Sequence, residues 1–136
     1  MTKTEGDFTP SQLYRLIDAN LNRLREGIRT CEDIQRYIYN NKTVARKLKA
    51  LRHQSRVEKH QKFLQYRDIV GDVLKKTTNS ESNRSNIEDI IIANIKRAQE
   101  SARVLEESFK LIDIQEAEKF KLIRYSLYDI EKSIFI

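Results

Sequence analysis

Two segments of the chain carry asparagine, arginine and glutamate at intervals of three residues, and these residue types are suited to binding phosphate. An arginine guanidinium can donate two parallel hydrogen bonds to a phosphate and keeps its charge, while a neighbouring carboxylate can orient it. The pattern therefore indicates a site for a phosphorylated ligand. The first series is Asn20, Arg23, Glu26, Arg29 and Glu32, and the second is Asn94, Arg97, Glu100, Arg103 and Glu106.

The two series belong to an internal repeat. A shift of 74 positions aligns 18–33 with 92–107, with six identities in 16 positions, and a shift of 72 aligns "KLKALRH" with "KFKLIRY". The second shift places Arg52 on Arg124 and His53 on Tyr125. A duplicated helical hairpin predicts an all-α, pseudo-twofold four-helix bundle. We expect a single domain over 1–136, with one repeat at about 10–66, a loop at 67–84 and the other repeat at about 85–136.

The helices that must position these side chains follow from apolar residues spaced three and four apart. A capping box at Thr9 and Gln12, with Pro10 in the first turn, predicts a helix that continues to about Tyr39. "NNKT" at 40–43 breaks the chain, and a second helix is expected from Thr43 to about Arg67. "SNIE" at 85–88 opens a third helix that ends near Ile112, and "DIQE" at 113–116 opens a fourth.

The helical period of ~100° per residue places Asn20 and Asn94 within apolar stripes and Arg23 at the edge of its stripe. The asparagines either hydrogen-bond one another or water across the pseudo-twofold axis, or they contact the ligand. Surface ion pairs contribute only about 0.2–0.5 kcal/mol each, which poorly explains two series kept in identical order. We therefore expect a buried polar seam lined by Arg23, Arg29, Arg97 and Arg103, with Glu26 and Glu100 orienting the guanidinium groups.

The segment "RDIVGDVLKKTTNSESNR" at 67–84 is too long for a simple turn, and it reads either as a mobile linker or as a binding loop. Its Asp68 and Asp72 fit two interpretations, a solvated acidic loop or a magnesium site, because Mg²⁺ takes oxygen ligands. The chain contains neither a GxxxxGK[ST] phosphate loop nor a kinase-type glycine loop. Side chains would have to hold any phosphate.

Composition narrows the class of partner and the compartment. With 26 basic and 20 acidic residues the net charge is +6, which favours anionic partners, but the interleaved signs argue against nucleic acid. No apolar run approaches the ~20 residues of a membrane span, and the N-terminus has no secretory core. The single cysteine, Cys31, permits no internal disulfide and falls in the apolar stripe. We expect a cytoplasmic protein, and the apolar "SIFI" at the C-terminus favours a homodimer contact.

Four segments, "DANLNRLREGIRTCEDIQRYI", "LKALRH", "IANIKRAQESARVLEE" and "LIRYSLYDIEKSIF", together resemble the helical domain found alone or fused ahead of thiamine phosphate synthase barrels. The resemblance covers about 12–135 and implies a hydroxymethylpyrimidine phosphate kinase of thiamine biosynthesis, with ATP as cosubstrate and Mg²⁺ as cofactor. It does not imply the synthase reaction, because a barrel needs ~200 residues or more. A separate thiamine phosphate synthase is a partner that the resemblance suggests.

The long loop departs from the family pattern R-D-T-x-x-D-V-G-T. This chain keeps Arg67, Asp68, Asp72 and Val73 but has Ile69, Leu74 and Lys75 where the pattern has threonine, glycine and threonine. A glycine that lets the backbone approach phosphate has become leucine, which bears on catalysis more than on fold.

We therefore expect phosphorylation of 4-amino-5-hydroxymethyl-2-methylpyrimidine phosphate to the diphosphate. The alternative is a non-catalytic helical protein that binds a phosphorylated ligand or a partner protein. Catalysis is assigned to Arg67, Asp68 and Asp72, with both aspartates holding Mg²⁺. Substrate and phosphate binding is assigned to Asn20, Arg23, Glu26, Arg29, Arg52, His53, Arg84, Asn94, Arg97, Glu100, Arg103 and Arg124.

Overall fold

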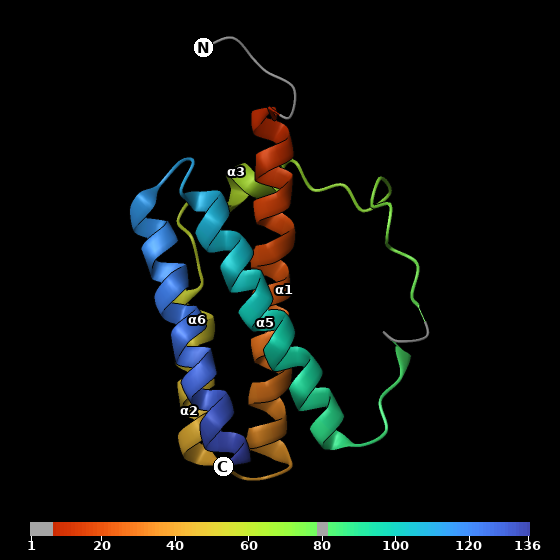
Figure 1. Cartoon of the computed structure of the whole chain (residues 1–136), viewed down its shortest axis with the longest axis vertical. Coiled ribbons are helices and arrows are strands. Elements are labelled where there is room, and N and C mark those ends of the chain that lie inside the picture. The colour runs from red at the N-terminus through yellow and green to blue at the C-terminus, as the bar shows by residue number, and fades with distance from the viewer. Residues whose placement is uncertain (1–6, 79–81) are drawn as a thin grey trace.

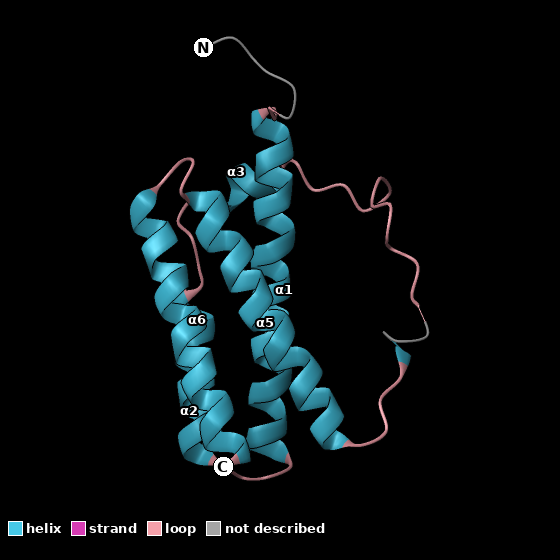
Figure 2. Ribbon diagram, in the orientation of Figure 1, coloured by secondary structure: helices cyan, strands magenta, loops and turns pink. Residues whose placement is uncertain are grey.

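The computed structural model describes residues 7–78 and 82–136, in which helices and loops are present and no strand occurs (Figure 2). The all-α prediction is therefore confirmed. None of the described helices is both long and apolar enough to cross a membrane. The helices are α1 (Pro10–Tyr37), α2 (Lys42–Gln54), α3 (His60–Leu64), α5 (Ile87–Phe109) and α6 (Ile114–Phe135).

Two antiparallel hairpins, α1–α2 and α5–α6, form the bundle (Figure 1). α1 and α5 pack against each other most extensively, each hairpin packs internally, and α2 meets α6 over a smaller area. The short α3 lies near the end of the bundle where α1 begins, and residues 67–78, which follow α3, extend away from the bundle (Figure 1). This arrangement confirms a helical bundle built from a duplicated hairpin.

Side-chain caps set most of the predicted helix starts. The Thr9 side chain accepts a hydrogen bond from the backbone N–H of Gln12, and the Gln12 side chain accepts one from the backbone N–H of Thr9. The expected capping box is therefore present. Asn40, with φ of 51°, lies in the left-handed region that terminates helices, and Asn41 then caps α2. Asp113 caps α6 as expected, whereas the cap of α5 is Asn86 rather than Ser85.

The second helix is shorter than predicted. It ends at Gln54 instead of about Arg67, and only His60–Leu64 becomes helical again as α3. Ser55, which is fully buried, donates its hydroxyl to the Arg52 carbonyl at 2.6 Å. A serine side chain that bonds to a nearby backbone carbonyl competes with the hydrogen bonds that would continue the helix. The spacing of apolar residues alone does not predict this effect.

The core is one continuous cluster of aliphatic and aromatic side chains contributed by α1, α2, α3, α5 and α6. Burial of these side chains is the main favourable term in folding. Its most deeply buried members are Ile17, Leu24 and Ile28 of α1, Leu48 of α2, Ile91, Ile95 and Leu105 of α5, and Phe120, Ile123 and Leu127 of α6. At the C-terminus Phe135 and Ile136 are exposed, and the homodimer contact stays a prediction.

α1 and α5 approach each other closely where Gly27 faces α5. A methyl group at Gly27 would lie 2.8 Å from the backbone oxygen of Asn94 and 3.4 Å from the Ala98 Cβ. Ala98 and Ala102 of α5 are both fully buried. Small side chains let the two backbones meet here, as ridges-into-grooves packing requires at a close crossing.

The two repeated asparagines do not pair with each other. Asn20 is buried as predicted, and its Nδ2 donates to the Leu16 carbonyl at 2.9 Å. Asn94 is half-buried and donates to the Ile90 carbonyl at 2.8 Å in the same way. The alternative in which the two asparagines bond to each other is therefore wrong, because each Nδ2 donates to the carbonyl four residues earlier in its own helix.

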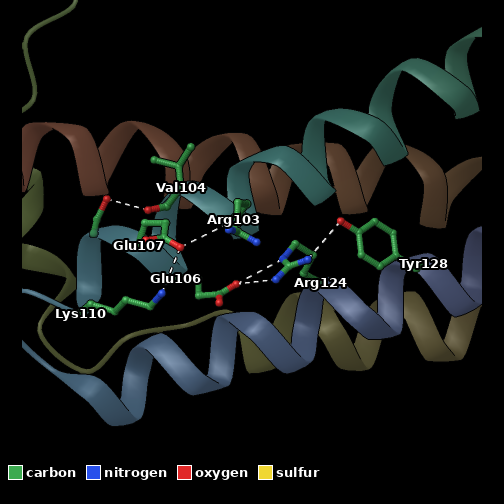
Figure 3. Close-up of polar contacts among 8 residues, drawn as sticks. Arg103, Val104, Glu106, Glu107, Lys110, Arg124 and Tyr128 are labelled. Atoms are coloured by element: carbon green, nitrogen blue, oxygen red, sulfur yellow. Dashed lines mark hydrogen bonds and ion pairs between the residues drawn. The ribbon is translucent and has the colours of Figure 1, made fainter.

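Each hairpin is instead joined by a buried ion pair at equivalent repeat positions. Arg52 of α2 donates Nε and Nη2 to Glu32 of α1 at 2.8 and 3.2 Å. Arg124 of α6 donates Nη2 and Nε to Glu106 of α5 at 2.8 and 3.2 Å (Figure 3). The Glu106 and Arg124 side chains are each only 9% exposed, and Arg124 also donates to the Tyr128 hydroxyl at 3.3 Å.

Removing one partner of such a pair leaves a buried charge without compensation. We expect Glu106→Ala to lower the free energy of unfolding by about 3–5 kcal/mol, measured by urea denaturation. Glu107→Ala is the matched control, because Glu107 is half exposed and bonds only at the surface to Arg103 and Lys110. The control should cost about 0–1 kcal/mol. Equal losses in both variants would contradict a structural role for the buried pair.

Candidate functional site

An open cleft between α1 and the segment after α3, called here the loop cleft, collects five of the predicted site residues. Its volume is about 640 Å³, which is within the range of small-molecule sites. The predicted residues that line it are Asn20, Arg23, Arg67, Asp68 and Asp72. Arg15, Asp18, Asn22 and Lys75 line it as well.

An aromatic anchor fixes where the loop begins. Phe63 of α3 is buried and packs edge-on against Tyr14 of α1 at 5.4 Å and against Phe109 of α5 at 5.8 Å between ring centroids. Such edge-to-face pairs add to the free energy gained by burial. α3 is thus held against both central helices, and Arg67 follows it directly.

A bidentate ion pair then attaches the loop to α1. Arg67 donates Nε and Nη2 to the Asp18 carboxylate at 2.7 and 2.9 Å, and the Asp18 side chain is only 8% exposed. The hydrogen bond to Asp18 raises the pKa of Arg67. Arg15 adds a bond from Nη2 to the Asp68 carbonyl at 3.1 Å. Arg15 and Arg67 therefore line the cleft and also hold the loop against α1.

The two loop carboxylates each have one oxygen bonded to the loop backbone. Asp68 Oδ1 accepts from the Gly71 N–H at 2.8 Å, and Asp72 Oδ1 accepts from the Leu74 N–H at 3.0 Å. Within 7–78 and 82–136 no group of three or more His, Cys, Asp or Glu side chains could hold a metal ion. Mg²⁺ in phosphoryl-transfer sites commonly uses only one or two carboxylates together with phosphates and water. Asp68 and Asp72 fit that reduced donor set.

The expected buried seam of arginines is wrong. Arg23, Arg29, Arg97 and Arg103 are all exposed, as are Glu26 and Glu100. Each three-residue step turns ~60° around a helix, so the middle members of both series reach the solvent side. Arg29 instead pairs with Asp33 at 3.3 Å and Arg103 with Glu107 at 3.3 Å, both as surface contacts within one helix.

The other predicted residues lie away from the loop cleft. Arg52 and Arg124 are occupied by the buried glutamates and stabilise the hairpins. His53 is exposed on α2, where desolvation and the charges of Arg52, Arg56 and Lys49 lower its pKa. Arg84 lies just before α5, and Asn94, Arg97, Glu100 and Arg103 lie on α5. The second series thus does not contribute to this cleft.

Sequence reasoning missed Asp18, Arg15 and Lys75. A signal for Asp18 was present in the repeat, because its counterpart at the shift of 74 is Ile92. Ile92 is exposed and cannot pair with an arginine. A polar residue that breaks an otherwise repeated pattern marks a role belonging to one hairpin only.

By its structure, the protein is an all-α helical bundle with a cationic cleft on one hairpin. The ThiD2 family model matches residues 15–133, and the chain belongs to this family. No solved structure matches the chain.

Three similar proteins are named thiamine-phosphate synthase. The Synechocystis sp. protein is 38% identical over 93% of this chain and 37% of its own length. The Nostoc punctiforme protein is 36% identical over 90% of this chain and 35% of its length, and the Rhodopirellula baltica protein is 36% identical over 85% and 32%. This chain therefore spans about a third of the length of these relatives.

The Asp18–Arg67 pair should control how firmly the loop is held. We expect Asp18→Ala to increase the rate of limited proteolysis within 69–78 several-fold, because Arg67 loses both bonds to α1. Asp33→Ala is the control, since Asp33 pairs at the surface with Arg29 on the same helix and does not touch the loop. Unchanged cleavage in the Asp18 variant would show that the ion pair does not anchor the loop.

Cys31 should behave as a core residue and not as a nucleophile. It is fully buried with its Sγ 3.6 Å from the Ile91 carbonyl oxygen, and burial raises its pKa to about 12. The raised pKa favours the neutral thiol in the folded state. The contribution of Cys31 to the free energy of unfolding is therefore complete below the pKa that Cys31 has in the unfolded chain, and it is lost as the pH rises toward 12. A thiol reagent at pH 8 should label Cys31 only after denaturation. Rapid labelling of the folded protein would contradict this assignment.

Proposed function

We propose that this protein acts in thiamine biosynthesis as a kinase that transfers the γ-phosphate of ATP to 4-amino-5-hydroxymethyl-2-methylpyrimidine phosphate. The observation that carries the proposal is the loop cleft, in which arginines, a lysine and three carboxylates converge in a chain of the ThiD2 family. Relatives named thiamine-phosphate synthase support the pathway. We do not propose the synthase reaction, because the family match lies in a helical region that covers about a third of those proteins.

The charges in the cleft suit a polyphosphate. Arg23 and Lys75 line it, and neither side chain forms an ion pair with another described residue. Their positive charge would be compensated by phosphate oxygens, as in other phosphoryl-transfer sites where positioning and electrostatic stabilisation supply most of the catalysis. Among the described residues, Lys75 donates to the Val70 carbonyl alone, at 3.4 Å.

Asp68 and Asp72, which line the cleft, would hold Mg²⁺ through their carboxylates. Bound there, the ion would supply positive charge that offsets the negative charge of the phosphates. Arg67, held by Asp18 in the wall of the cleft, would contact the acceptor phosphate. Its bidentate bond to Asp18 limits the motion of the guanidinium, and such preorganisation lowers the cost of binding.

The proposed reaction is a single displacement at phosphorus. An oxygen of the acceptor's phosphate attacks the γ-phosphorus of ATP and forms a new P–O bond. The bond from the γ-phosphorus to the β,γ-bridging oxygen breaks, and ADP leaves with that electron pair. The products are the pyrimidine diphosphate and ADP.

A ligand-binding protein without transferase activity is the second candidate. It is favoured by the loop contacts, because one oxygen of each loop aspartate already accepts a backbone N–H. Leu74, which replaces a glycine of the family pattern, is 82% exposed and places a side chain where a backbone could otherwise approach phosphate.

The two candidates are separated by a product assay with matched variants. Protein with ATP, Mg²⁺ and the pyrimidine monophosphate should yield the diphosphate, and Arg23→Ala should reduce kcat/KM by at least 10-fold, as expected for the loss of a charge-assisted hydrogen bond. Arg97→Ala is the control, because Arg97 is the repeat counterpart of Arg23 but lies outside the cleft. It should leave kcat/KM within about twofold.

Absence of product, together with a rise in melting temperature on adding the monophosphate, would favour the ligand-binding candidate. Equal losses in the Arg23 and Arg97 variants would contradict the location of the site. If neither product nor a thermal shift is observed, both candidates are excluded.

A further inference from the structure

The early end of α2 opens a second cavity beside the loop cleft, called here the corner cavity. Its volume is about 340 Å³. It lies where the chain leaves α2 at Ser55 and returns through α3. In the second hairpin the equivalent helix does not stop, because α6 continues beyond Leu127, the counterpart of Ser55 at the shift of 72, to Phe135. The corner cavity is thus a feature of the first hairpin.

The duplicated hairpin provides an internal comparison for the charges in this corner. In the second hairpin Gln99 of α5 donates to Glu131 of α6 at 2.9 Å, so the polar groups satisfy each other. The counterparts in the first hairpin are Arg25 and Lys59, two cations. Tyr128, which accepts a hydrogen bond from Arg124, is likewise replaced by Arg56. Partnered polar residues in one hairpin thus correspond, in the other, to cations whose side chains form no hydrogen bond or ion pair with another described residue.

Arg25 is the cation of the corner cavity whose surroundings best suit an anion. Its Nε is buried and has no hydrogen-bond partner among the described residues. Burial, followed by the charges of Arg56 and Arg52, lowers its pKa. Buried donors in proteins are nearly always bonded to protein, water or ligand, so an acceptor is expected beside this Nε, and the like charges around it favour a negatively charged one. An anion would satisfy the donor and relieve the repulsion together.

The walls of the corner cavity also suit an uncharged ring. Leu21, Val57 and Leu64 line it next to Arg25, Arg56 and His60. Apolar walls with a few convergent polar groups are typical of sites for small organic ligands, and 340 Å³ is within their range. A free inorganic anion would use the cations but leave the apolar walls without a partner.

The corner cavity and the loop cleft share a wall. Asp18, Asn22 and Arg67 line both, so the Asp18–Arg67 ion pair stands between them. A ligand bound in the corner cavity with its phosphate toward Arg67 would present that phosphate to the loop cleft.

We propose that the corner cavity binds a phosphomonoester of a small heterocycle, with the ring against Leu21, Val57 and Leu64 and the phosphate held by Arg25 and Arg56. Identifying this ligand as the phosphate acceptor rests on the proposed function. On that basis the acceptor occupies the corner cavity and ATP occupies the loop cleft. The γ-phosphate is then transferred between them beside Arg67, which lines both. The assignment of a phosphomonoester site depends only on the cavity and its charges.

Binding measured without turnover tests the assignment. The pyrimidine monophosphate is titrated calorimetrically into the full chain in the absence of ATP and Mg²⁺. Arg25→Gln, which introduces the residue found in the second hairpin, should weaken binding about 10- to 100-fold, as expected for the loss of a charge-assisted hydrogen bond. Arg56→Gln should weaken it comparably. Arg29→Gln is the matched control, because Arg29 is exposed on α1 and pairs only with Asp33, and its affinity should not change.

ATP with Mg²⁺, titrated into the same variants, distinguishes the two cavities. Its affinity should fall in Arg23→Ala and stay within about twofold in Arg25→Gln. Inorganic phosphate should bind more weakly than the pyrimidine monophosphate, because it lacks the ring. Equal affinity for the two would overturn the role of the apolar walls.

The outcomes separate this inference from the proposed function. Monophosphate binding that depends on Arg25 supports the inference even if no diphosphate forms with ATP, in which case only the kinase proposal fails. Monophosphate binding that depends on Arg23 but not on Arg25 or Arg56 overturns it, while the kinase proposal stands. Absence of monophosphate binding at millimolar concentration overturns it as well. Melting temperatures of all variants establish that each one is folded.

Discussion

A buried glutamate–arginine ion pair joins the two helices of each hairpin, and the rest of the bundle depends on this contact. Glu32 with Arg52 and Glu106 with Arg124 occupy equivalent repeat positions. Desolvating two charges is costly and is offset only when the geometry and the remaining hydrogen bonds are good. The pairs therefore set the register of each hairpin strictly, because a shifted register would leave charges buried without partners. The apolar faces of α1 and α5 are then aligned for the close approach at Gly27.

Symmetry and asymmetry in this molecule have different physical origins. The ion pairs, the asparagine bonds to the preceding turn and the surface pairs of Arg29 and Arg103 all occur twice, and all stabilise helices or hairpins. The first hairpin departs from the second at Asp18, at Arg25 and at the early end of α2. These departures line the two cavities. Duplicated structure thus supplies the scaffold, and the differences between its halves supply the candidate chemistry.

Two arginines lie where an anionic ligand could compensate their charge. Arg23 in the loop cleft and Arg25 in the corner cavity form no ion pair with other described residues. Leaving the buried Nε of Arg25 without a partner costs stability, and functional sites are where proteins retain such a cost. An anionic ligand would bind to both cavities more strongly at low ionic strength, because the arginine at each site is partly screened by salt.

The sequence by itself determined the helical class, the duplication, most helix starts and the family resemblance, because caps, periodicity and repeats act over a few neighbouring residues. It also indicated that Asn20, Arg23, Arg67, Asp68 and Asp72 belong to a site. Only the tertiary structure decided which members of each series are buried, since Glu32 and Glu106 find arginines about 20 positions away. It likewise decided that Ser55 ends α2 and that Arg67 reaches Asp18, 49 positions earlier. Such contacts depend on how helices pack, which local periodicity does not specify.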